Sequence, residues 1–395
     1  MNVLIGPNGS GKSNLLSGIG LLQQAGSGNL AAAIAGQGGI ETILWRNEPL
    51  GGISWKLELS SHFQGEAVTS AASQPIENLA YELLLSPSNV VGFEIAREIL
   101  CAYPDPEKAN SLTFLDRNYR QAILIGSERE RLEVPPDGFE PTQTILGRAH
   151  EVAALREVCF LYERFASWGV YQNLDVHWDS PVRRAAANGN EIRLTAQGHN
   201  LLPLLHTLYS SAEFQSGVNN AIQAAFGNDF ERLEFTRLED GQLRAQLRWK
   251  SLSHLQDVSD LSDGTLRFLM LLAILLNPGR GDLVAIDEPE VSLDPSMLPI
   301  IAELAFEASR TSQVIVSTHS PEFLGALIEQ GAATTVVQAP EGETKLSTLD
   351  RDDLARWLQK YESGGLFPTA GGGDIGLLPD SVVEVKTQGR NQSPS

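Results

Sequence analysis

A glycine-rich segment near the start of the chain constrains the fold more than any other feature. Gly6 to Ser13 read GPNGSGKS, which matches the pattern G-x-x-x-x-G-K-[ST]. The apolar run at residues 2–5 precedes it, and a stretch with leucine and isoleucine at helical spacing follows. A strand, a glycine-rich turn and a helix in this order place backbone N–H groups and the positive end of the helix dipole around phosphate oxygens. The pattern therefore predicts an α/β fold with a phosphate site at this turn.

Each residue type in this segment has a task in binding a nucleoside triphosphate. We expect Lys12 to reach the β and γ phosphates and the Ser13 hydroxyl to bind Mg²⁺. The other interpretation is a glycine-rich turn that binds nothing, and the flanking strand and helix argue against it. The residues expected to contact the nucleotide are Gly6, Asn8, Gly9, Ser10, Gly11, Lys12, Ser13 and Asn14.

Two adjacent carboxylates, Asp287 and Glu288, stand at the end of the apolar run LVAID. An acid at the tip of a buried strand can hold Mg²⁺ through water, and its neighbour can orient or deprotonate an attacking water molecule. We expect Asp287 to do the first and Glu288 the second. Such a pair alone is as often a helix cap or a solvated loop, but a phosphate loop in the same chain favours the catalytic interpretation.

Two further motifs contain residues that can meet a γ phosphate. His319 directly follows the apolar run QVIVST, where a histidine can hydrogen-bond that phosphate or the lytic water, although a lone histidine is more often structural. Residues 261–265 read LSDGT and open an apolar stretch, with Ser262 or Asp263 as the expected helix cap. Ser262 and Gly264 at a helix N-terminus also form a surface that can address the nucleotide of another subunit. The alternative is an ordinary capped core helix.

Composition narrows the class of protein. The chain has 395 residues and a formal net charge of -20, which argues against a basic nucleic-acid footprint over the whole surface but allows a local basic stripe. Cys101 and Cys159 lie too far apart for a zinc or CxxC pattern, so we expect a reducing compartment. No apolar run reaches membrane-spanning length, and we therefore expect a cytoplasmic protein.

Hydrophobic periodicity outlines the order of the elements. Alternating segments between residues 39 and 125 predict an antiparallel β layer, and Asp240-Gly241 between two alternating runs predicts a hairpin. Residues 173–178 and 190–195 are predicted as further strands. The continuous apolar runs LVAID and QVIVST predict parallel strands buried on both faces. The expected divisions are an N-terminal part of the nucleotide-binding fold at 1–145, an inserted α/β lobe at 146–250, a C-terminal part at 251–363 and a flexible tail at 364–395.

Taken in order, GPNGSGKSN, LSDGTLRFL, LVAIDEPE, SLDP and STHSPEFL resemble the Walker A, signature, Walker B, D-loop and switch-histidine motifs of ABC-type ATPases. DEPE and STHSPEFL are most similar to the RecF, SMC and OLD-like branch, and within it to bacterial ATPases of the AAA domain 21 class (AAA_21). The resemblance covers residues 1–30 and 250–335 and implies a P-loop NTPase fold. Transporters usually have glycine where this signature has Asp263, which supports the non-transporter branch.

This resemblance implies a role for each matched residue. Lys12, Glu288 and His319 would act on ATP, with Glu288 as the general base and His319 sensing the γ phosphate. Ser13 and Asp287 would hold Mg²⁺. The residues that would complete a partner's site, or communicate with it across an ATP-dependent homodimer, are Ser262, Gly264 and Asp294.

The chain also departs from the family pattern. Members usually place two strands and a loop before the phosphate loop, whereas here five residues precede Gly6. We expect the native start to lie upstream of Met1, the alternative being a truncated chain with a damaged base pocket. No glutamine can be assigned to the magnesium shell. The region after His319 lacks a second acidic centre of the TOPRIM nuclease type, so DNA cleavage by this chain is not expected.

The expected activity is Mg²⁺-dependent hydrolysis of ATP to ADP and phosphate, which drives two heads together and apart. By resemblance, the cycle would serve DNA repair, chromosome maintenance or phage defence, acting on DNA or with a separately encoded effector protein. Two alternatives stay open. One is the motor subunit of an ABC transporter, which the signature and the DEPE motif argue against, and the other is a degenerate regulatory module that does not hydrolyse ATP.

Overall fold

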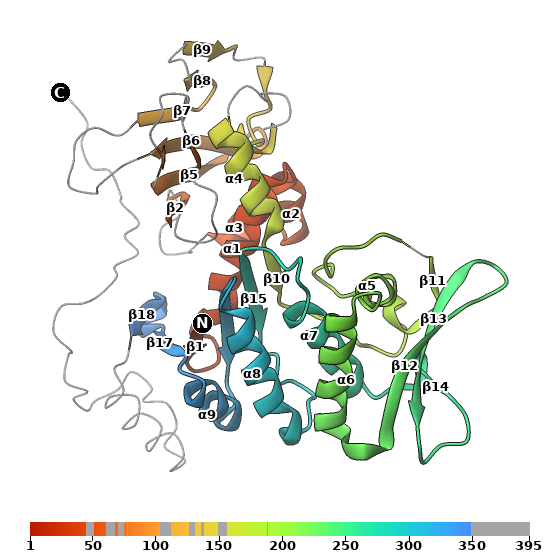
Figure 1. Ribbon diagram of the computed structural model, residues 1–395. Helices are drawn as coiled ribbons and strands as arrows, with labels where there is room; N and C mark the ends of the chain where they lie inside the picture. The colour runs from red at the N-terminus through yellow and green to blue at the C-terminus, as the bar shows by residue number, and fades with distance from the viewer. Residues whose placement is uncertain are drawn as a thin grey trace, which may run out of the picture. The chain divides into compact units, whose positions relative to one another are not determined.

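The computed structural model describes residues 1–44, 51–60, 68–69, 75–76, 78–102, 112–125, 131–135, 138–148, 156–187 and 189–348 of the chain. These residues form two compact units, whose elements Figure 1 labels along the chain. Unit 1 consists of residues 1–17 and the described residues from 169 onward, and unit 2 consists of the described residues between 18 and 168. The divisions predicted at 145, 250 and 363 remain predictions, and the predicted tail lies outside the described residues.

Unit 1 is built on a mostly parallel sheet, as the apolar runs predicted. In spatial order its strands are β10 (Gly169–Tyr171), β15 (Leu283–Asp287), β16 (Gln313–Thr318), β1 (Asn2–Ile5), β17 (Ala333–Gln338) and β18 (Lys345–Thr348). Among these strands only β18 runs antiparallel, against β17. All five residues of β15 are buried, which confirms a strand that is covered on both faces. Strand β1 therefore leads into the phosphate loop from the interior of the sheet.

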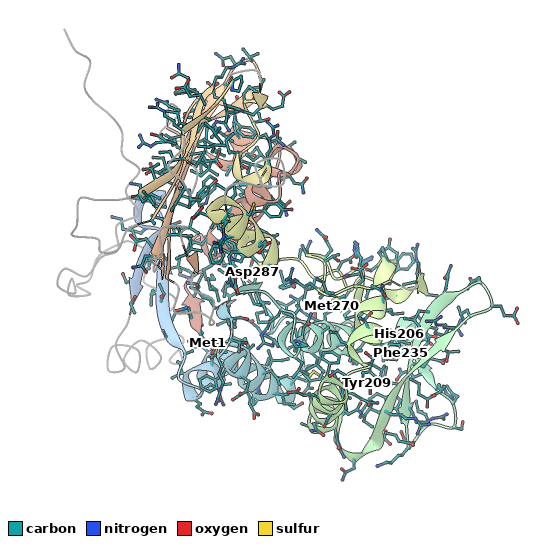
Figure 2. The ribbon with its side chains drawn as sticks, turned by 45° about the horizontal axis from the view of Figure 1, so that its top comes forward. Met1, His206, Tyr209, Phe235, Met270 and Asp287 are labelled. Atoms are coloured by element: carbon teal, nitrogen blue, oxygen red, sulfur yellow. The ribbon has the colours of Figure 1, made fainter. Side chains whose placement is uncertain are left out.

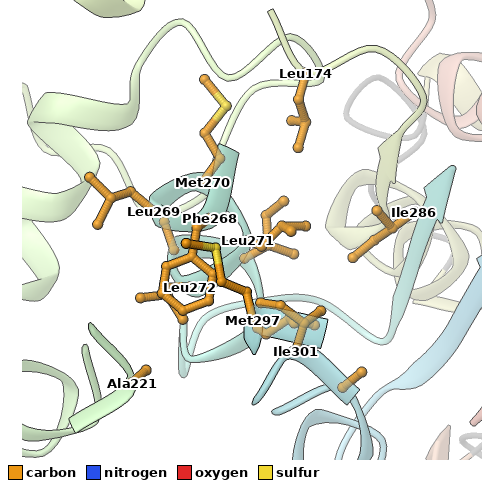
Figure 3. Packing of buried hydrophobic residues seen from close by; sticks show 14 of the residues in the cluster. Leu174, Ala221, Phe268, Leu269, Met270, Leu271, Leu272, Ile286, Met297 and Ile301 are labelled. Carbon is orange, nitrogen blue, oxygen red and sulfur yellow. The ribbon is translucent and has the colours of Figure 1, made fainter. Parts of the chain in front are cut away.

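The helices of unit 1 follow the predicted apolar segments. Their bounds are α7 (Asp263–Leu275), α8 (Leu298–Ala308) and α9 (Pro321–Glu329), and α1 (Lys12–Gly26) begins in unit 1 and ends in unit 2. Every residue of α7 from Leu266 to Leu275 is buried. Figure 3 shows Phe268 and Leu272 of this helix among the core side chains around Met297. Because α7 is covered on all sides, only the residues of its N-terminal turn are available for contacts outside the core.

A smaller antiparallel sheet in unit 1 contains the predicted hairpin. Its strands are β11 (Ala186–Ala187), β12 (Phe230–Arg237), β13 (Gln242–Trp249) and β14 (Gln256–Asp257), and the helices beside it in the chain are α5 (Leu201–Leu208) and α6 (Ala212–Phe226). Gly241 has a φ of +82° in the hairpin turn, as an Asp-Gly turn requires. The Phe235 ring lies edge-on to His206 and Tyr209, at 5.5 and 5.4 Å between ring centres, so this face of β12 meets α5 (Figure 2).

The prediction of strands at residues 173–178 and 190–195 is wrong. Neither segment pairs with a neighbouring strand, although both contain alternating apolar residues. Their backbone groups form isolated hydrogen bonds, such as the one from the Asp175 N–H to the Gln197 carbonyl at 2.9 Å. Alternation alone cannot form a strand when no neighbouring backbone lies in register to complete the ladder.

Unit 2 contains the predicted antiparallel layer. The strands of its six-stranded sheet, in order, are β2 (Ile53–Ser60), β5 (Asn78–Ser88), β6 (Gly92–Ala102), β7 (Leu112–Asn118), β8 (Gln121–Ile125) and β9 (Arg131–Val134). A separate two-stranded pair consists of β3 (Val68–Thr69) and β4 (Pro75–Ile76). The remaining helices of unit 2 are α2 (Leu30–Gly36), α3 (Ile40–Ile43) and α4 (Arg156–Ser167). Short 3-10 turns occur in unit 2 at 146–148 and in unit 1 at 181–183, 227–229, 258–260, 295–297 and 340–342.

A buried ion pair joins two strands of unit 2. Glu98 on β6 and Arg117 on β7 are both fully buried, and their charged groups lie 3.6 Å apart. The Glu98 carboxylate accepts from the Tyr81 hydroxyl at 3.1 Å and from the N–H groups of Ile145 and Leu146 at 2.8 and 3.0 Å. Burial raises the pKa of Glu98, while Arg117 and these donors oppose the rise. The pair thus holds the segment around residue 145 against the sheet.

Candidate functional site

The phosphate loop lies between β1 and α1, and its geometry requires glycine. Gly9 and Gly11 have φ values of +78° and +99°, which other residues rarely adopt. A Cβ atom on Gly6 would lie 2.1 Å from the carbonyl oxygen of Val337. The Ser10 N–H donates to the Pro7 carbonyl at 3.2 Å and closes the turn. The glycines therefore allow a tight curl that no larger residue could form.

Lys12 lies inside this curl. Its side chain is 4% exposed, and its ammonium group donates to the carbonyls of Gly6 and Pro7 at 2.8 and 3.1 Å. Burial lowers the pKa of Lys12, and the negative charges of Glu288 and Asp287 act against that fall. The cation is thus held near the acidic end of β15 while its hydrogen bonds stay within its own loop.

The loop fits the phosphate group predicted for it. Ser10 is 2% exposed, and its hydroxyl has no hydrogen-bond partner among the described residues. The first turn of α1 contributes N–H groups that have no acceptor within the helix. A phosphate at this point would accept from these donors and lie beside the Lys12 ammonium. Asn8, Ser13 and Asn14 are exposed, so these predicted contact residues are open to a ligand.

The end of β15 presents the two predicted carboxylates in different surroundings. Asp287 is 9% exposed and accepts from the Ser317 hydroxyl, on the neighbouring strand β16. Glu288 has a φ of +46°, which is uncommon for a residue other than glycine. Its N–H donates to the Ser317 carbonyl at 3.1 Å. The backbone is therefore held in a strained conformation where the strand ends, and such strain clusters at functional sites.

His319 meets Glu288 directly. The His319 Nε2 atom contacts the Glu288 carboxylate, and the two side chains are about one third exposed, at 31% and 32%. The His319 N–H and the Thr318 hydroxyl both donate to one oxygen of Glu290, at 3.0 and 2.5 Å. The other Glu290 oxygen is buried and has no hydrogen-bond partner within the described ranges. The structure thus brings Glu288 and His319, which are far apart in sequence, into one acid and imidazole pair.

Two residues of this region were missed in the sequence. Gln172, directly after β10, donates to the Ser13 carbonyl at 2.7 Å and accepts from the Ser17 hydroxyl at 3.1 Å. It thus lies beside Ser13, the residue predicted to bind Mg²⁺. Arg267 on α7 is 8% exposed and donates to the Glu288 carbonyl at 3.1 Å. Gln172 follows a strand of only three residues, and Arg267 lies within an otherwise apolar helical run, so neither residue stands out in the sequence.

The residues predicted to act across a dimer lie at two neighbouring turns. Ser262 is the N-cap of α7 and accepts from the Thr265 N–H at 3.1 Å, which confirms one of the two expected caps. A Cβ on Gly264 would lie 2.1 Å from the Ser292 carbonyl, so the two turns are in direct contact. Asp294 is exposed and accepts from the Ser296 hydroxyl at 2.6 Å, which lowers the pKa of Asp294.

No hydrogen bond or ion pair between the described residues joins Ser262, Gly264 or Asp294 to Lys12 or Asp287. Arg183 donates to Asp263 at 2.6 Å and to the Leu261 carbonyl at 2.6 Å, and so fixes the start of α7. The start of α7 is thus a rigid element whose Ser262 remains exposed.

The family profile described as "AAA domain, putative AbiEii toxin, Type IV TA system" (AAA_21) matches residues 1–136 and 167–325. No curated protein matches the chain. Among the described residues, no helix is both long and apolar enough to cross a lipid bilayer.

Several solved structures are similar to the chain over most of its length. An SmcHead bound to the C-winged helix domain of ScpA is 15% identical, with 89% of this chain and 91% of that chain covered and a TM-score of 0.45. The SMC head domain from Thermotoga maritima is 15% identical, with 88% and 90% covered and a TM-score of 0.34. A Smc head domain with an extended coiled coil from Pyrococcus furiosus, bound to the C-terminal domain of ScpA, is 13% identical, with 91% and 93% covered and a TM-score of 0.41. Likeness at this level says nothing about activity or partners.

Proposed function

The chain belongs to the AAA_21 family, and from that membership we propose that it binds ATP and hydrolyses it to ADP and phosphate. The contact of Glu288 with His319 carries this proposal, because it places a carboxylate and an imidazole together where β15 and β16 end. The negative charges of Glu288 and of Asp287, the last residue of β15, raise the pKa of Lys12 in the phosphate loop against the effect of burial. A cation for the phosphates and a base for water therefore belong to one site.

Catalysis would rest on positioning and charge. The phosphate loop and Lys12 would hold the β and γ phosphates, and Glu288 would accept a proton from the water that attacks the γ phosphorus. The bond from that phosphorus to the oxygen bridging it to the β phosphorus would break as the new bond forms. His319 would keep the Glu288 carboxylate turned toward the water and would contact the γ phosphate. Arg267 would keep the Glu288 backbone in place from the other side.

The residues present fit a magnesium ion that is shared with the nucleotide. Ser13 and Asp287 would hold Mg²⁺, with Gln172 beside Ser13, and the bound ion would neutralise charge on the phosphates. Within the described ranges, no group of three or more His, Cys, Asp or Glu side chains is arranged to hold a metal by itself. A Mg²⁺ ion held by one or two side chains and by phosphates needs no such group.

The test of this proposal is ATP turnover by a Glu288→Gln variant, which keeps the shape of the side chain and removes its basicity. We expect phosphate release to fall by about 100- to 1,000-fold while the affinity for ATP stays within about threefold. The matched control is Glu303→Gln, an exposed residue of α8, which should leave the turnover unchanged. Equal turnover in the two variants would show that Glu288 is not the base.

We also propose that ATP brings two copies of this chain together. The exposed Ser262 and the half-buried Gly264 at the start of α7 would meet the γ phosphate held by the partner, and the exposed Asp294 would contact the partner across the interface. Light scattering of Glu288→Gln protein should therefore give a dimer with Mg-ATP and a monomer with Mg-ADP. A monomer under both conditions would contradict the shared site while leaving ATP binding untouched.

A link to DNA repair, chromosome maintenance or phage defence is proposed on the resemblance alone. Direct DNA binding would have to overcome the net charge of -20. On the smaller sheet of unit 1, Arg232 lies 2.8 Å from Glu234 and Arg244 lies 3.2 Å from Asp257, so these arginines already have acidic neighbours. Binding to a labelled duplex at increasing salt concentrations tests the point, since a phosphate-binding surface loses affinity as salt rises.

A further inference from the structure

The connection between β17 and β18 touches the phosphate loop from outside the predicted nucleotide motifs. The Thr344 hydroxyl, directly before β18, donates to the Ser10 carbonyl at 3.1 Å. The same hydroxyl lies 2.2 Å from the point where a Cβ on Gly11 would stand. Val337, near the end of β17, places its carbonyl oxygen 2.1 Å from the point where a Cβ on Gly6 would stand. The end of β17 and the residue before β18 therefore contact the phosphate loop at two places.

The hydrogen bond from Thr344 to the Ser10 carbonyl oxygen also constrains the direction of the neighbouring Gly11 N–H. This carbonyl and the Gly11 N–H belong to one planar trans peptide unit, in which the C=O and N–H bonds point in opposite directions. Gly11 has a φ of +99°, and glycine peptides in this region can rotate with little steric resistance. Holding the oxygen on the side of Thr344 therefore turns the Gly11 N–H to the opposite side, away from the β17–β18 connection.

We propose that Thr344 is a positioning residue for the nucleotide phosphates, which aims the Gly11 N–H into the phosphate loop through its hydrogen bond to Ser10. This inference rests on the proposed binding of ATP. Thr344 would touch no reacting atom, because it would act only through the orientation of one peptide unit. Without the hydroxyl, the peptide can rotate and place the Ser10 carbonyl toward the phosphates, where it would repel them.

A role of this kind affects binding rather than the chemical step. The phosphate loop would hold phosphates that ATP and ADP share, so the affinity for both should fall by the same factor. Because the peptide is oriented alike before and during hydrolysis, KM should rise while kcat stays within about twofold. A general loss of structure would lower kcat and the melting temperature together.

The experiment compares Thr344→Val, which keeps the shape and removes the hydroxyl, with Thr344→Ser, which keeps the hydroxyl. The affinities of full-length protein for ATP and ADP would be measured by titration calorimetry. We expect Thr344→Val to weaken both by about three- to tenfold, as the loss of one neutral hydrogen bond implies, and Thr344→Ser to stay within about twofold. The matched control is Thr348→Val, an exposed threonine on β18, which should bind as the wild type does.

Each of the other outcomes overturns the role of Thr344, the proposed function or both. If Lys12→Met loses nucleotide binding and Thr344→Val binds nucleotide as tightly as the wild type, the role of Thr344 is overturned and the proposed function stands. Equal losses in the valine and serine variants would assign the effect to packing against Gly11 and would also overturn the hydrogen-bond role. A wild-type chain that binds no nucleotide would overturn both the proposed function and this inference.

Discussion

Two regions of the molecule bury charged side chains, and they treat them in opposite ways. In unit 2, both oxygens of Glu98 meet donors from the protein, and Arg117 donates to the carbonyls of Tyr119, Gln143 and Pro141 at 2.8, 2.5 and 3.2 Å. In the phosphate loop of unit 1, Lys12 bonds to carbonyls of its own loop. One buried charge is surrounded by permanent partners, and the other is held by groups that a ligand could replace.

The difference separates a structural role from a binding role. Around the phosphate loop, the Ser10 hydroxyl and one Glu290 oxygen are buried without a hydrogen-bond partner among the described residues, and Glu288 has an unfavourable φ. Unmet donors, unmet acceptors and backbone strain each lower stability, so their occurrence together at one place points to a ligand or a reaction there. The hydrogen bonds of Glu98 show no such deficit. Buried charge alone is therefore a poor guide to function, and the state of its partners is a better one.

The largest expected effect is on stability, from Arg117→Met. The variant leaves the buried Glu98 carboxylate without its cation, which should lower the free energy of unfolding by about 3–5 kcal/mol. Urea denaturation measures the loss, and faster hydrogen exchange at the amides of Ile145 and Leu146 would locate it. The control is Arg97→Met, because Arg97 is half exposed and lies 3.9 Å from Glu82, and it should cost less than about 1 kcal/mol. Similar losses in the two variants would contradict a structural role for the buried pair.

The pH dependence of the Arg117→Met variant sharpens the same point. Burial raises the pKa of Glu98 above its ordinary value, and removal of the cation raises it further. A raised carboxyl pKa gives a contribution to stability that is present below the unfolded pKa and is lost as pH rises through the folded pKa. The deficit of the variant should therefore shrink as pH falls from 7 toward the unfolded pKa of about 4.5. Denaturation curves over this range would show a constant deficit if Glu98 played no part.

The smallest expected effect on stability comes from Lys12→Met, although this variant should lose nucleotide binding. Burial lowers the pKa of Lys12, which means that its charge is costly to hold in the folded state. Replacing it with an apolar side chain should change the free energy of unfolding by less than about 1 kcal/mol and weaken ATP binding at least about 100-fold. A Lys12→Met variant that binds ATP normally but has a much lower free energy of unfolding would show that Lys12, like Arg117, has a structural role.

Local patterns in the sequence predicted the phosphate loop, the two carboxylates at the end of β15 and the parallel strands. In each case the signal lies within a few consecutive residues, because a glycine loop or a buried strand requires its residue types at adjacent positions. The pairing of Glu288 with His319 was not visible in this way. It depends on the register of β15 against β16, which sets Asp287 opposite Ser317 and so brings the two strand ends together.

Some details within the predicted elements could not be read from the sequence because they break the local rule of alternation. Strand β6 contains Glu98 at a position that faces the interior, and Ile95 and Ala96 are both buried, so the period of two is interrupted. Irregular pairing between β5 and β6 at Leu84 and Leu85 is the physical reason, since a bulge shifts which residues face inward. Gln172 follows a strand of three residues, which is too short to stand out by periodicity.

The position of β1 also sets the order in which the molecule can be completed on the ribosome. Asn2 pairs with Ile315 on one side and with Ala333 on the other, so both neighbours of this strand are made near the end of the described chain. The phosphate loop follows β1 directly and cannot be fixed until those neighbours have left the exit tunnel. A nascent chain would therefore keep an apolar strand unpaired for most of its translation, as contacts of high sequence separation require. Premature termination before β16 would leave β1 without either of the strands that pair with it.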